Sequence, residues 1–567
     1  MLDDARAGRA RLFAAPVATI AVSATAEMAP AIAALRDAAS GGRHLAGFLS
    51  YEGARALSGL GTAPASLPLL WFGVFAEVRS VDPAELLPSG NGAWLGEAKP
   101  VLAYPAYAAA ITRAQEYIAA GDIYQVNLTF PATVPVAGHP LALYAGLRAR
   151  AGAAWGGVVH TGEHWLLSLS PELFFTLDNG KLVTRPMKGT AARDPDPATD
   201  RGAAGLLASD PKQQAENLMI VDLLRNDLAQ VAVAGSVQVP RLFEVETYPT
   251  VHQLTSTIVA DLAAGHDAFD VLGALAPSGS VTGAPKRRAL EVIDELEVEA
   301  RGIYTGALGT IGPDGTSAAF NVAIRTLTLA PDGSSARLGL GSGITSGSNA
   351  RDEWRECLAK GAFVPSPRRF DLVETMAFDP QVGILRLDAH LGRTAASAHR
   401  FGFTFDRHRA RNELQAATFR LRRSARLRLV VSARGGIAVE VRDTFPPPTL
   451  PVPVALAPLP VDPADFRLRH KTSDRRFYRT SGDAFDTVFL DPDGFVTEGG
   501  FTSVFVERDG VLLTPPLTRG LLPGILRAEL LTDGRAREAD LRADDLRDCF
   551  YLGNSLRGLL PARLRGL

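Results

Sequence analysis

Amine chemistry in this chain is confined to a few residues. The sequence has 59 lysine and arginine residues, of which seven are lysine: Lys99, Lys181, Lys188, Lys212, Lys286, Lys360 and Lys471. Arginine stays protonated and cannot attack carbon, whereas a lysine that loses its proton can act as a nucleophile or form a Schiff base. Arginine-biased codon usage explains the surface cations. We therefore expect any functional amine to be one of these seven lysines.

The first two thirds of the chain contain the elements that would position such residues. Apolar residues at helical spacing predict a helix over 107–119, followed by a Gly-Asp stop and an apolar strand. Turn signals at 161–162 and 178–180 predict hairpins between successive strands. The segment 215–232 has a helical pattern. Its expected buried face consists of Leu218, Val221, Leu224 and Leu228.

Two proline-rich breaks divide the rest of the chain. VPSPRR at 364–369 is the best linker candidate. Beyond it, FDLVETMAF predicts a strand, and LDAHLGRTAASAHRFGF predicts a helix that ends at Gly402. A second break, TFPPPTLPVPV at 444–454, predicts two lobes over about 370–445 and 455–567.

Composition excludes several classes of protein. The net charge of -2 provides no field that would gather nucleic acid or an anionic membrane. Two cysteines, Cys357 and Cys549, cannot build a disulfide framework, which favours the reducing cytoplasm. No apolar run has the length of a membrane helix. A faint likeness to a signal peptide at 9–26 is opposed by its interrupting proline and by the acidic residues before it.

Several strings before residue 364 resemble the chorismate-utilising enzymes, the family of anthranilate synthase and aminodeoxychorismate synthase large subunits. They occur in the order typical of that family. The strings are SPELFF (170–175), RPMKGTAARD (185–194), AENLMIVDLLRNDL (215–228), VHQLTSTI (251–258), PSGSVTGAPKRRALEVIDELE (277–297), RGIYTGALG (301–309), NVAIRT (321–326) and EWRECLAKG (353–361).

This resemblance implies an α+β fold with a chorismate-binding α/β sandwich. The expected organisation is an N-terminal part (1–95), the chorismate-binding catalytic domain (96–363), the linker and a last unit (370–567). Chorismate carries two carboxylates, so its site needs cations, main-chain N–H groups and a metal. The resemblance assigns Mg²⁺ to Glu216 and Glu356, whose oxygens suit that ion.

The substrate-binding residues are also implied by the resemblance. Tyr304 and Arg325 match positions that bind the enolpyruvyl carboxylate, supported by N–H groups near Gly341 and Gly343. His252 matches a position beside the departing hydroxyl, and a hydrogen-bonded core histidine is the alternative interpretation of this residue.

Lys188 distinguishes between members of the family. Anthranilate synthases have a small residue at this place, whereas aminodeoxychorismate synthases carry lysine. A poised amine there would attack ring C2 as the C4 hydroxyl leaves. Glu172 matches the general acid and base for that hydroxyl. Isochorismate and salicylate synthases use a lysine where this chain has Gln125, which disfavours hydration of chorismate. Lys286 is expected to be structural or to line the substrate entrance.

The last unit resembles the class IV fold of pyridoxal-phosphate enzymes, which includes branched-chain and D-amino-acid transaminases and aminodeoxychorismate lyase. The strings are FDLVETM (370–376), LDAHLGRTAASAHRFGF (387–403), HKTSDRRFY (470–478), DTVFLDPDGFVTEGGFTSVFV (486–506), LTPPLTRGLLPGILR (513–527) and GNSLRGLLP (553–561). This implies a two-lobed fold that binds pyridoxal 5'-phosphate, which needs a Schiff-base lysine, an acid at the pyridine nitrogen and a phosphate cup.

Lys471 is the only lysine of the last unit and would form the Schiff base. By resemblance, Glu498 would face the pyridine nitrogen and Arg393 the phosphate. Two N–H groups at a helix start, those of Ile525 and Leu526, would complete the phosphate cup. Thr502 matches the small hydroxyl residue of the class IV pattern in the phosphate cup.

Two departures from the class IV pattern affect the phosphate side. Ser503 stands where the family usually has asparagine, and the usual glycine-aspartate-glycine turn before the first strand is missing.

Together the two resemblances imply 4-aminobenzoate formation in folate synthesis. Chorismate would be aminated at C4, and pyruvate would then be eliminated. Two alternatives remain: an anthranilate-type synthase fused to a class IV aminotransferase, and a synthase with a non-catalytic C-terminal scaffold. Neither cysteine lies in a glutaminase-type nucleophile turn, so a separate glutaminase would supply ammonia. Active sites of class IV enzymes often lie at the interface of a dimer. The resemblance is therefore compatible with a homodimer that forms through this unit.

Overall fold

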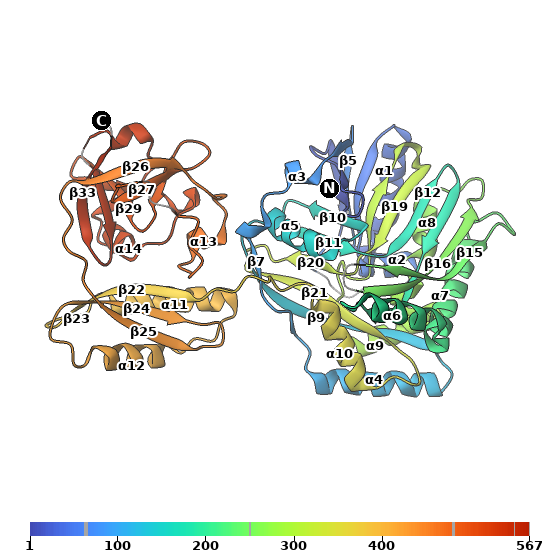
Figure 1. The fold of residues 1–567 in the computed structure, drawn as a ribbon. Coiled ribbons are helices and arrows are strands. Elements are labelled where there is room, and N and C mark those ends of the chain that lie inside the picture. The colour runs from blue at the N-terminus through green and yellow to red at the C-terminus, as the bar shows by residue number, and fades with distance from the viewer. Residues whose placement is uncertain (62–65, 249–250, 479–481, 549, 566–567) are drawn as a thin grey trace. The chain divides into compact units, whose positions relative to one another are not determined.

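The computed structural model describes residues 1–61, 66–248, 251–478, 482–548 and 550–565 (Figure 1). The chain forms two compact units. Unit 1 comprises residues 1–87, 97–134 and 144–365, and unit 2 comprises residues 88–96, 135–143 and 366–567. The main boundary falls within the predicted linker. Two short segments that sequence reasoning placed before the linker belong to unit 2.

Unit 1 contains two large, mostly antiparallel sheets. The first has the spatial order β17 (Gly283–Ala284), β9 (Gln125–Ala137), β21 (Ser335–Ile344), β20 (Thr326–Leu329), β11 (Trp165–Ser170), β10 (Trp155–His160), β1 (Leu2–Asp4), β2 (Arg9–Leu12) and β6 (Arg79–Val81), with β8 (Lys99–Pro100) paired to β9. The second has the order β14 (Met187–Ala192), β16 (Val251–Asp261), β13 (Lys181–Arg185), β12 (Leu173–Asp178), β19 (Ser317–Val322), β18 (Ala307–Ile311), β4 (His44–Leu49), β5 (Leu70–Phe75) and β3 (Ala18–Val22), with β15 (Gln238–Thr247) paired to β16.

The helices that accompany these sheets pack through their apolar faces. They are α1 (Met28–Ser40), α2 (Tyr51–Leu57), α3 (Pro83–Leu86), α4 (Tyr104–Ala119), α5 (Pro140–Ala151), α6 (Pro197–Ser209), α7 (Pro211–Ala229), α8 (Ala268–Leu275), α9 (Lys286–Leu296) and α10 (Ala350–Gly361). One core joins residues of α1, α7 and α8 to the second sheet, with Phe72, Phe175 and Phe320 fully buried. The mixed helix and sheet architecture confirms the predicted fold class.

Helix α7 differs in one respect from the predicted pattern. Val221, Leu224 and Leu228 are buried, but Leu218 is 43% exposed. Asn217 and Ile220 share the buried face instead. With 3.6 residues per turn, Asn217 lies close to the line through Val221, Leu224 and Leu228. Leu218 is three residues before Val221 but lies further round the helix, at the edge of this buried face. The predicted face was therefore wrong at Leu218.

Unit 2 has two sheets. The strands of the first precede the predicted break at 444–454, and the second begins within that break, at Val452. The first has the order β23 (Gly383–Ile384), β22 (Leu372–Asp379), β24 (Ala425–Val431) and β25 (Ile437–Asp443). The second has the order β28 (Val496–Gly499), β27 (Asp486–Leu490), β26 (Val452–Pro458), β33 (Gly558–Leu564), β32 (Phe550–Asn554), β29 (Ser503–Arg508), β30 (Val511–Thr514) and β31 (Ala536–Glu538). The helices are α11 (Leu387–Phe401), α12 (Arg407–Thr418), α13 (Phe466–Arg469) and α14 (Ile525–Thr532).

An aromatic core explains why residues 88–96 belong to unit 2. Trp94, in β7 (Trp94–Leu95), contacts Phe370 and Phe401 with ring centroids 6.0 and 5.0 Å apart. Helix α11 ends at Phe401 because Gly402 adopts φ 64°, as the sequence predicts. Among the described residues, no helix combines the length and apolar character needed to cross a membrane.

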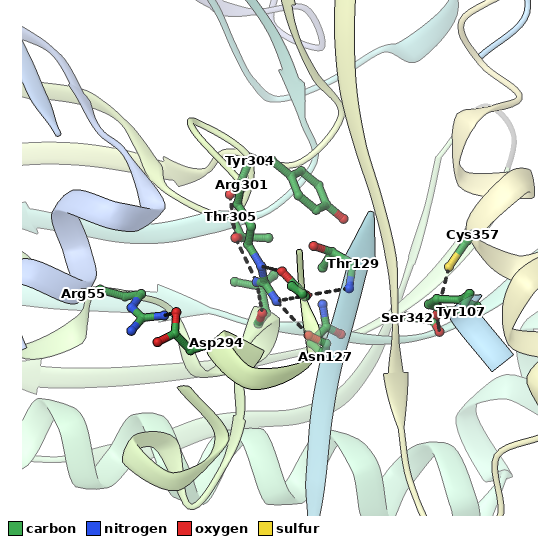
Figure 2. Close-up of polar contacts among 12 residues, drawn as sticks. Arg55, Tyr107, Asn127, Thr129, Asp294, Arg301, Tyr304, Thr305, Ser342 and Cys357 are labelled. Carbon is green, nitrogen blue, oxygen red and sulfur yellow. Dashed lines mark hydrogen bonds and ion pairs between the residues drawn. The ribbon is translucent and has the colours of Figure 1, made fainter. Parts of the chain in front are cut away.

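The one cysteine that the structure describes is buried in unit 1. Cys357 Sγ lies 3.4 Å from the Tyr107 hydroxyl, which is 2.9 Å from Ser342 Oγ (Figure 2). Cys549 lies outside the described residues.

Candidate active sites

Lys188 occupies the centre of the candidate site in unit 1. It lies in β14 on the edge of the second sheet. A Cβ atom placed on Gly343 would lie 3.4 Å from its Nζ, so the absence of a side chain leaves room for this amine. Burial lowers the pKa of Lys188, and Lys360 lowers it further, while Glu216 and Glu172 oppose the shift. This environment favours the neutral, nucleophilic amine.

Glu172 lies within electrostatic reach of Lys188, as the two predicted roles require. It is buried directly before β12, and its Oε1 accepts a 2.6 Å hydrogen bond from Ser280 Oγ. Burial raises the pKa of Glu172 to about 7 despite this bond and the charge of Lys188. A carboxyl group with that pKa can give and take a proton near neutral pH.

The two predicted metal ligands come from different helices, Glu216 from α7 and Glu356 from α10. Burial raises the pKa of Glu216, and the like charges of Glu356 and Glu353 add to the shift. Lys360 pairs with Glu356 at 2.7 Å. Among the described residues there is no group of three or more side chains suited to a metal. Two carboxylates still fit Mg²⁺, because that ion usually keeps several waters and takes further oxygens from substrate.

The predicted carboxylate-binding residues lie around β21. Tyr304 packs against Gly339, where an added Cβ would come within 2.0 Å of the ring. A Cβ on Gly341 would approach Thr129 Cγ2 to 2.7 Å, so this strand also needs glycine there. Arg325 precedes β20 with φ 50°, and burial lowers the pKa of its guanidinium. A bound carboxylate would compensate that desolvated charge.

Arg301 is a residue of this region that sequence reasoning missed. Its side chain is 1% exposed, and all five of its N–H groups have acceptors. Nε and Nη2 donate to Glu297 at 2.8 Å each, and Nη2 also donates to Asn127 O at 2.8 Å. Nη1 donates to Val281 O and Thr305 Oγ1, each at 3.1 Å (Figure 2).

The Arg301 network fixes the backbone on two sides of the site. Glu297 Oε1 also accepts from the Thr129 N–H of β9 at 2.7 Å. The Asn127 N–H donates to Thr282 O at 2.7 Å. Thus β9, which carries Asn127 and Thr129, is tied to the loop that carries Tyr304. Arg301 stands directly before the GIYTG string, and that adjacency was the available sequence signal.

Replacing Arg301 with methionine should destabilise unit 1 strongly. Removing one partner of a buried charge pair typically costs about 3 to 5 kcal/mol, because the other charge stays buried and unpaired. Thermal unfolding followed by near-ultraviolet circular dichroism measures the effect. Arg337→Met is the matched control, since the 45% exposed Arg337 pairs with Glu299 at the surface. Equal unfolding midpoints for the two variants would contradict the structural role of Arg301.

The side chains of His252 and Lys286 both form hydrogen bonds to other residues of unit 1. His252 Nε2 lies 2.9 Å from Asp200 Oδ1, and its Nδ1 lies 3.0 Å from Thr247 Oγ1. This geometry matches the core-histidine alternative, and a catalytic role for His252 stays a prediction. Lys286 Nζ donates to Asp227 Oδ2 and to Leu275 O, both at 2.8 Å, which fits a structural role.

In unit 2, Lys471 and Glu498 line one cavity together with Arg393. Burial lowers the pKa of Lys471 to about 8, while the charge of Glu374 opposes the shift. An amine with this pKa is partly neutral near neutral pH, as Schiff-base formation requires. Burial raises the pKa of Glu498, whose oxygens accept from the Tyr478 hydroxyl at 2.5 Å and the Leu522 N–H at 3.1 Å.

Arg393 is held by a buried carboxylate. Its Nε and Nη2 donate to the two oxygens of Glu374 at 2.8 and 2.7 Å, and Nη1 donates to Pro523 O at 2.9 Å. His390 Nδ1 lies 2.7 Å from the same carboxylate. Although burial opposes ionisation, Arg393 and His390 hold the pKa of Glu374 well below its usual range. Sequence reasoning identified Arg393 but missed this acidic partner.

The remaining cup residues lie in the same cavity. Thr502, Ser503, Ile525 and Leu526 line it, and the last two begin α14. Thr502 Oγ1 donates to Asp486 Oδ2 at 2.7 Å. A Cβ on Gly524 would lie 2.7 Å from Ser503 Oγ, so Ser503 faces the start of α14. A lone amine, a buried acid and a helix start around one cavity fit pyridoxal phosphate.

The folds and the two partly buried lysines, Lys188 and Lys471, define a two-domain protein with one candidate catalytic site in each unit. A family model described as chorismate binding enzyme matches residues 1–365, and one described as amino-transferase class IV matches residues 371–564. The chain therefore belongs to the chorismate-binding enzyme family, and its second unit is a class IV aminotransferase-like domain.

Individual relatives match part of the chain. Aminodeoxychorismate synthase component 1 of Escherichia coli is 42% identical over 45% of this chain and 55% of its own length. Anthranilate synthase component 1 of Streptomyces coelicolor is also 42% identical, over 46% of this chain and 50% of its own length. The solved anthranilate synthase component I of Streptococcus pneumoniae is 26% identical with a TM-score of 0.55, covering 62% and 91% of the two chains. The chain spans about half the length of these curated relatives.

Proposed function

We propose that the chain makes 4-aminobenzoate from chorismate in two steps. Unit 1 aminates chorismate at C4 to give 4-amino-4-deoxychorismate, and unit 2 eliminates pyruvate from that product. The observation that carries the proposal is the environment of Lys188. Its desolvated amine lies within electrostatic reach of the acid Glu172 and of the carboxylates Glu216 and Glu356. An aminodeoxychorismate synthase and an anthranilate synthase are each 42% identical to this chain, so sequence identity does not distinguish between the two activities. The amine of Lys188 is the feature that distinguishes them.

In the first step, Lys188 and Glu172 act on opposite ends of the diene. Nζ of Lys188 attacks C2, the double bonds shift, and the C4–O bond breaks as Glu172 protonates the departing hydroxyl. Ammonia then attacks C4, the double bonds shift back, and the C2–N bond breaks to release Lys188. The Glu172 carboxylate takes the extra proton from nitrogen. Mg²⁺ held by Glu216 and Glu356 would neutralise the ring carboxylate.

A Glu172→Gln substitution tests the proton transfer. The amide can neither give nor take a proton, so the rate of the first step should fall by about 100- to 10,000-fold. In the unsubstituted chain, the rate should decline as pH rises through about 7, because Glu172 then loses the proton that it must donate. Stopped assays of chorismate consumption across pH measure both effects. Glu163→Gln, at an exposed turn, is the control.

In the second step, Lys471 and Glu498 have separate tasks. Bound pyridoxal phosphate would supply an electron sink for the substrate. Lys471 Nζ then removes the C4 proton, the C3–O bond breaks, and pyruvate leaves as the ring becomes aromatic. Glu498, held by Tyr478 and the Leu522 N–H, would face the pyridine nitrogen and stabilise its protonated form.

The proposed function also includes a partner protein, a cellular location and an oligomeric state. Ammonia comes from a separate glutaminase, as the component 1 designation of the synthase relative supports. The two-cysteine content supports a cytoplasmic location. A homodimer through unit 2 remains part of the proposal, by analogy with class IV enzymes.

Removing and restoring the cofactor tests the two-step order. Cofactor-free chain supplied with chorismate, Mg²⁺ and ammonium should accumulate 4-amino-4-deoxychorismate. Adding pyridoxal phosphate should convert it to 4-aminobenzoate and one pyruvate per ring, measured by chromatography. If the intermediate persists after the cofactor has bound, unit 2 is a scaffold and not a lyase.

A further inference from the structure

Arg475 places a second guanidinium group in the unit 2 cavity. It lines the cavity with Lys471 and Glu498, four residues after the lysine. Its Nη1 is buried and has no hydrogen-bond partner among the described residues. The preceding Asp474 is engaged by Arg368 at 2.8 Å and Arg467 at 3.5 Å, so it does not neutralise Arg475.

The other two cations that line the cavity already have tasks. Lys471 is the candidate Schiff-base amine, and Arg393 donates two hydrogen bonds to Glu374 and one to Pro523 O. Leaving a buried charged donor without a partner is costly, and pairing it with a carboxylate removes that cost. The charge of Arg475 also lowers the pKa of both Lys471 and Glu498, two groups that line the same cavity.

The guanidinium is held without using its buried Nη1. The Arg475 carbon at the centre of the guanidinium lies 4.8 Å from the centroid of the Tyr478 ring. The Tyr478 hydroxyl is in turn fixed by its 2.5 Å hydrogen bond to Glu498. Arg475 is therefore prepositioned next to the cavity, where Nη1 can donate to an anion.

We propose that Arg475 binds a carboxylate of the substrate in unit 2. This inference rests on the proposed function, in which that substrate carries a ring carboxylate and an enolpyruvyl carboxylate. Both offer two oxygens to a planar guanidinium, which lysine cannot match in geometry. Arg475 thereby selects an anionic substrate and holds it while Lys471 moves the proton.

Steady-state kinetics with added 4-amino-4-deoxychorismate test the proposal on the cofactor-loaded chain. Arg475→Gln should raise KM by about 10- to 100-fold, the loss expected for one charged hydrogen bond. Arg475→Lys should recover part of that loss. The visible absorption band of the bound cofactor should remain, which shows that the cofactor still binds. Arg476→Gln is the matched control, because Arg476 is the exposed neighbour.

Binding of two carboxylate probes identifies the contact and needs no turnover. Pyruvate represents the enolpyruvyl carboxylate, and 4-aminobenzoate represents the ring carboxylate. Calorimetric titration of the loaded chain should show that Arg475→Gln weakens one probe by about tenfold or more and spares the other. The weakened probe identifies the carboxylate that Arg475 holds.

Two results would overturn the inference. One is unchanged KM and unchanged affinity for both probes. The other is an unchanged KM with an altered cofactor band, which would mean that Arg475 acts through Glu498. If the unsubstituted chain binds the probes but does not turn over 4-amino-4-deoxychorismate, the proposed function fails while the carboxylate contact is still measured.

Discussion

Lys188→Ala should abolish the formation of 4-aminobenzoate from chorismate and ammonium. Alanine leaves no amine to attack C2, and loss of a catalytic nucleophile lowers rates by about 10,000-fold or more. Lys360 cannot replace it, because its Nζ pairs with Glu356 at 2.7 Å and donates to Gly341 O at 2.9 Å. Discontinuous assays of both the aminated intermediate and the final product measure the effect.

The control for this substitution is Lys181→Ala. Lys181 lies in neighbouring β13, is 73% exposed and pairs with Asp261 at the surface. It should keep nearly full activity. Formation of 4-aminobenzoate at a comparable rate by Lys188→Ala would refute a nucleophilic role for Lys188.

Lys471→Ala should separate the two activities of the chain. Without its amine, unit 2 can neither attach the cofactor nor remove the C4 proton, so 4-aminobenzoate formation should fall by about 10,000-fold or more. The visible band of the bound cofactor should disappear. Unit 1 does not contain this residue and should continue to consume chorismate.

The products of Lys471→Ala provide an internal control. 4-Amino-4-deoxychorismate should accumulate at the rate at which the unsubstituted chain consumes chorismate. Adding a separate, active lyase should then release 4-aminobenzoate. Retention of the cofactor band by Lys471→Ala would mean that another amine forms the Schiff base.

Local sequence patterns predict much of the fold because they mark ends and turns. The turn at 178–180 joins β12 to β13, and Gly402 ends α11 as expected. Contacts between segments that are far apart in the sequence are harder to predict from local patterns. The membership of Trp94 in unit 2 depends on rings more than 270 residues further along the chain. The exposure of Leu218 likewise depends on which face of α7 meets the second sheet.

In the candidate sites too, residue types and local patterns are predictable, whereas contacts between distant residues are not. Lys188 and Lys471 are prominent in a lysine-poor sequence, and both lie in buried settings that lower the pKa of the amine. Arg301 and Glu374 act through partners, and those partners are chosen by the fold. Residue type alone cannot single out one of 52 arginines, or one of 24 glutamates, for such a role. Arg475 was hidden for the same reason, because its role is suggested by the cavity and by a nitrogen that has no hydrogen-bond partner in the described part of the chain.

The position at which nitrogen enters the ring tests the central claim most directly. The purified chain is incubated with chorismate, Mg²⁺, pyridoxal phosphate and isotopically labelled ammonium, and the aminobenzoate is identified by nuclear magnetic resonance. We expect labelled 4-aminobenzoate, because Lys188 attack at C2 directs ammonia to C4. Labelled 2-aminobenzoate would contradict the assignment of unit 1 as a C4-aminating synthase.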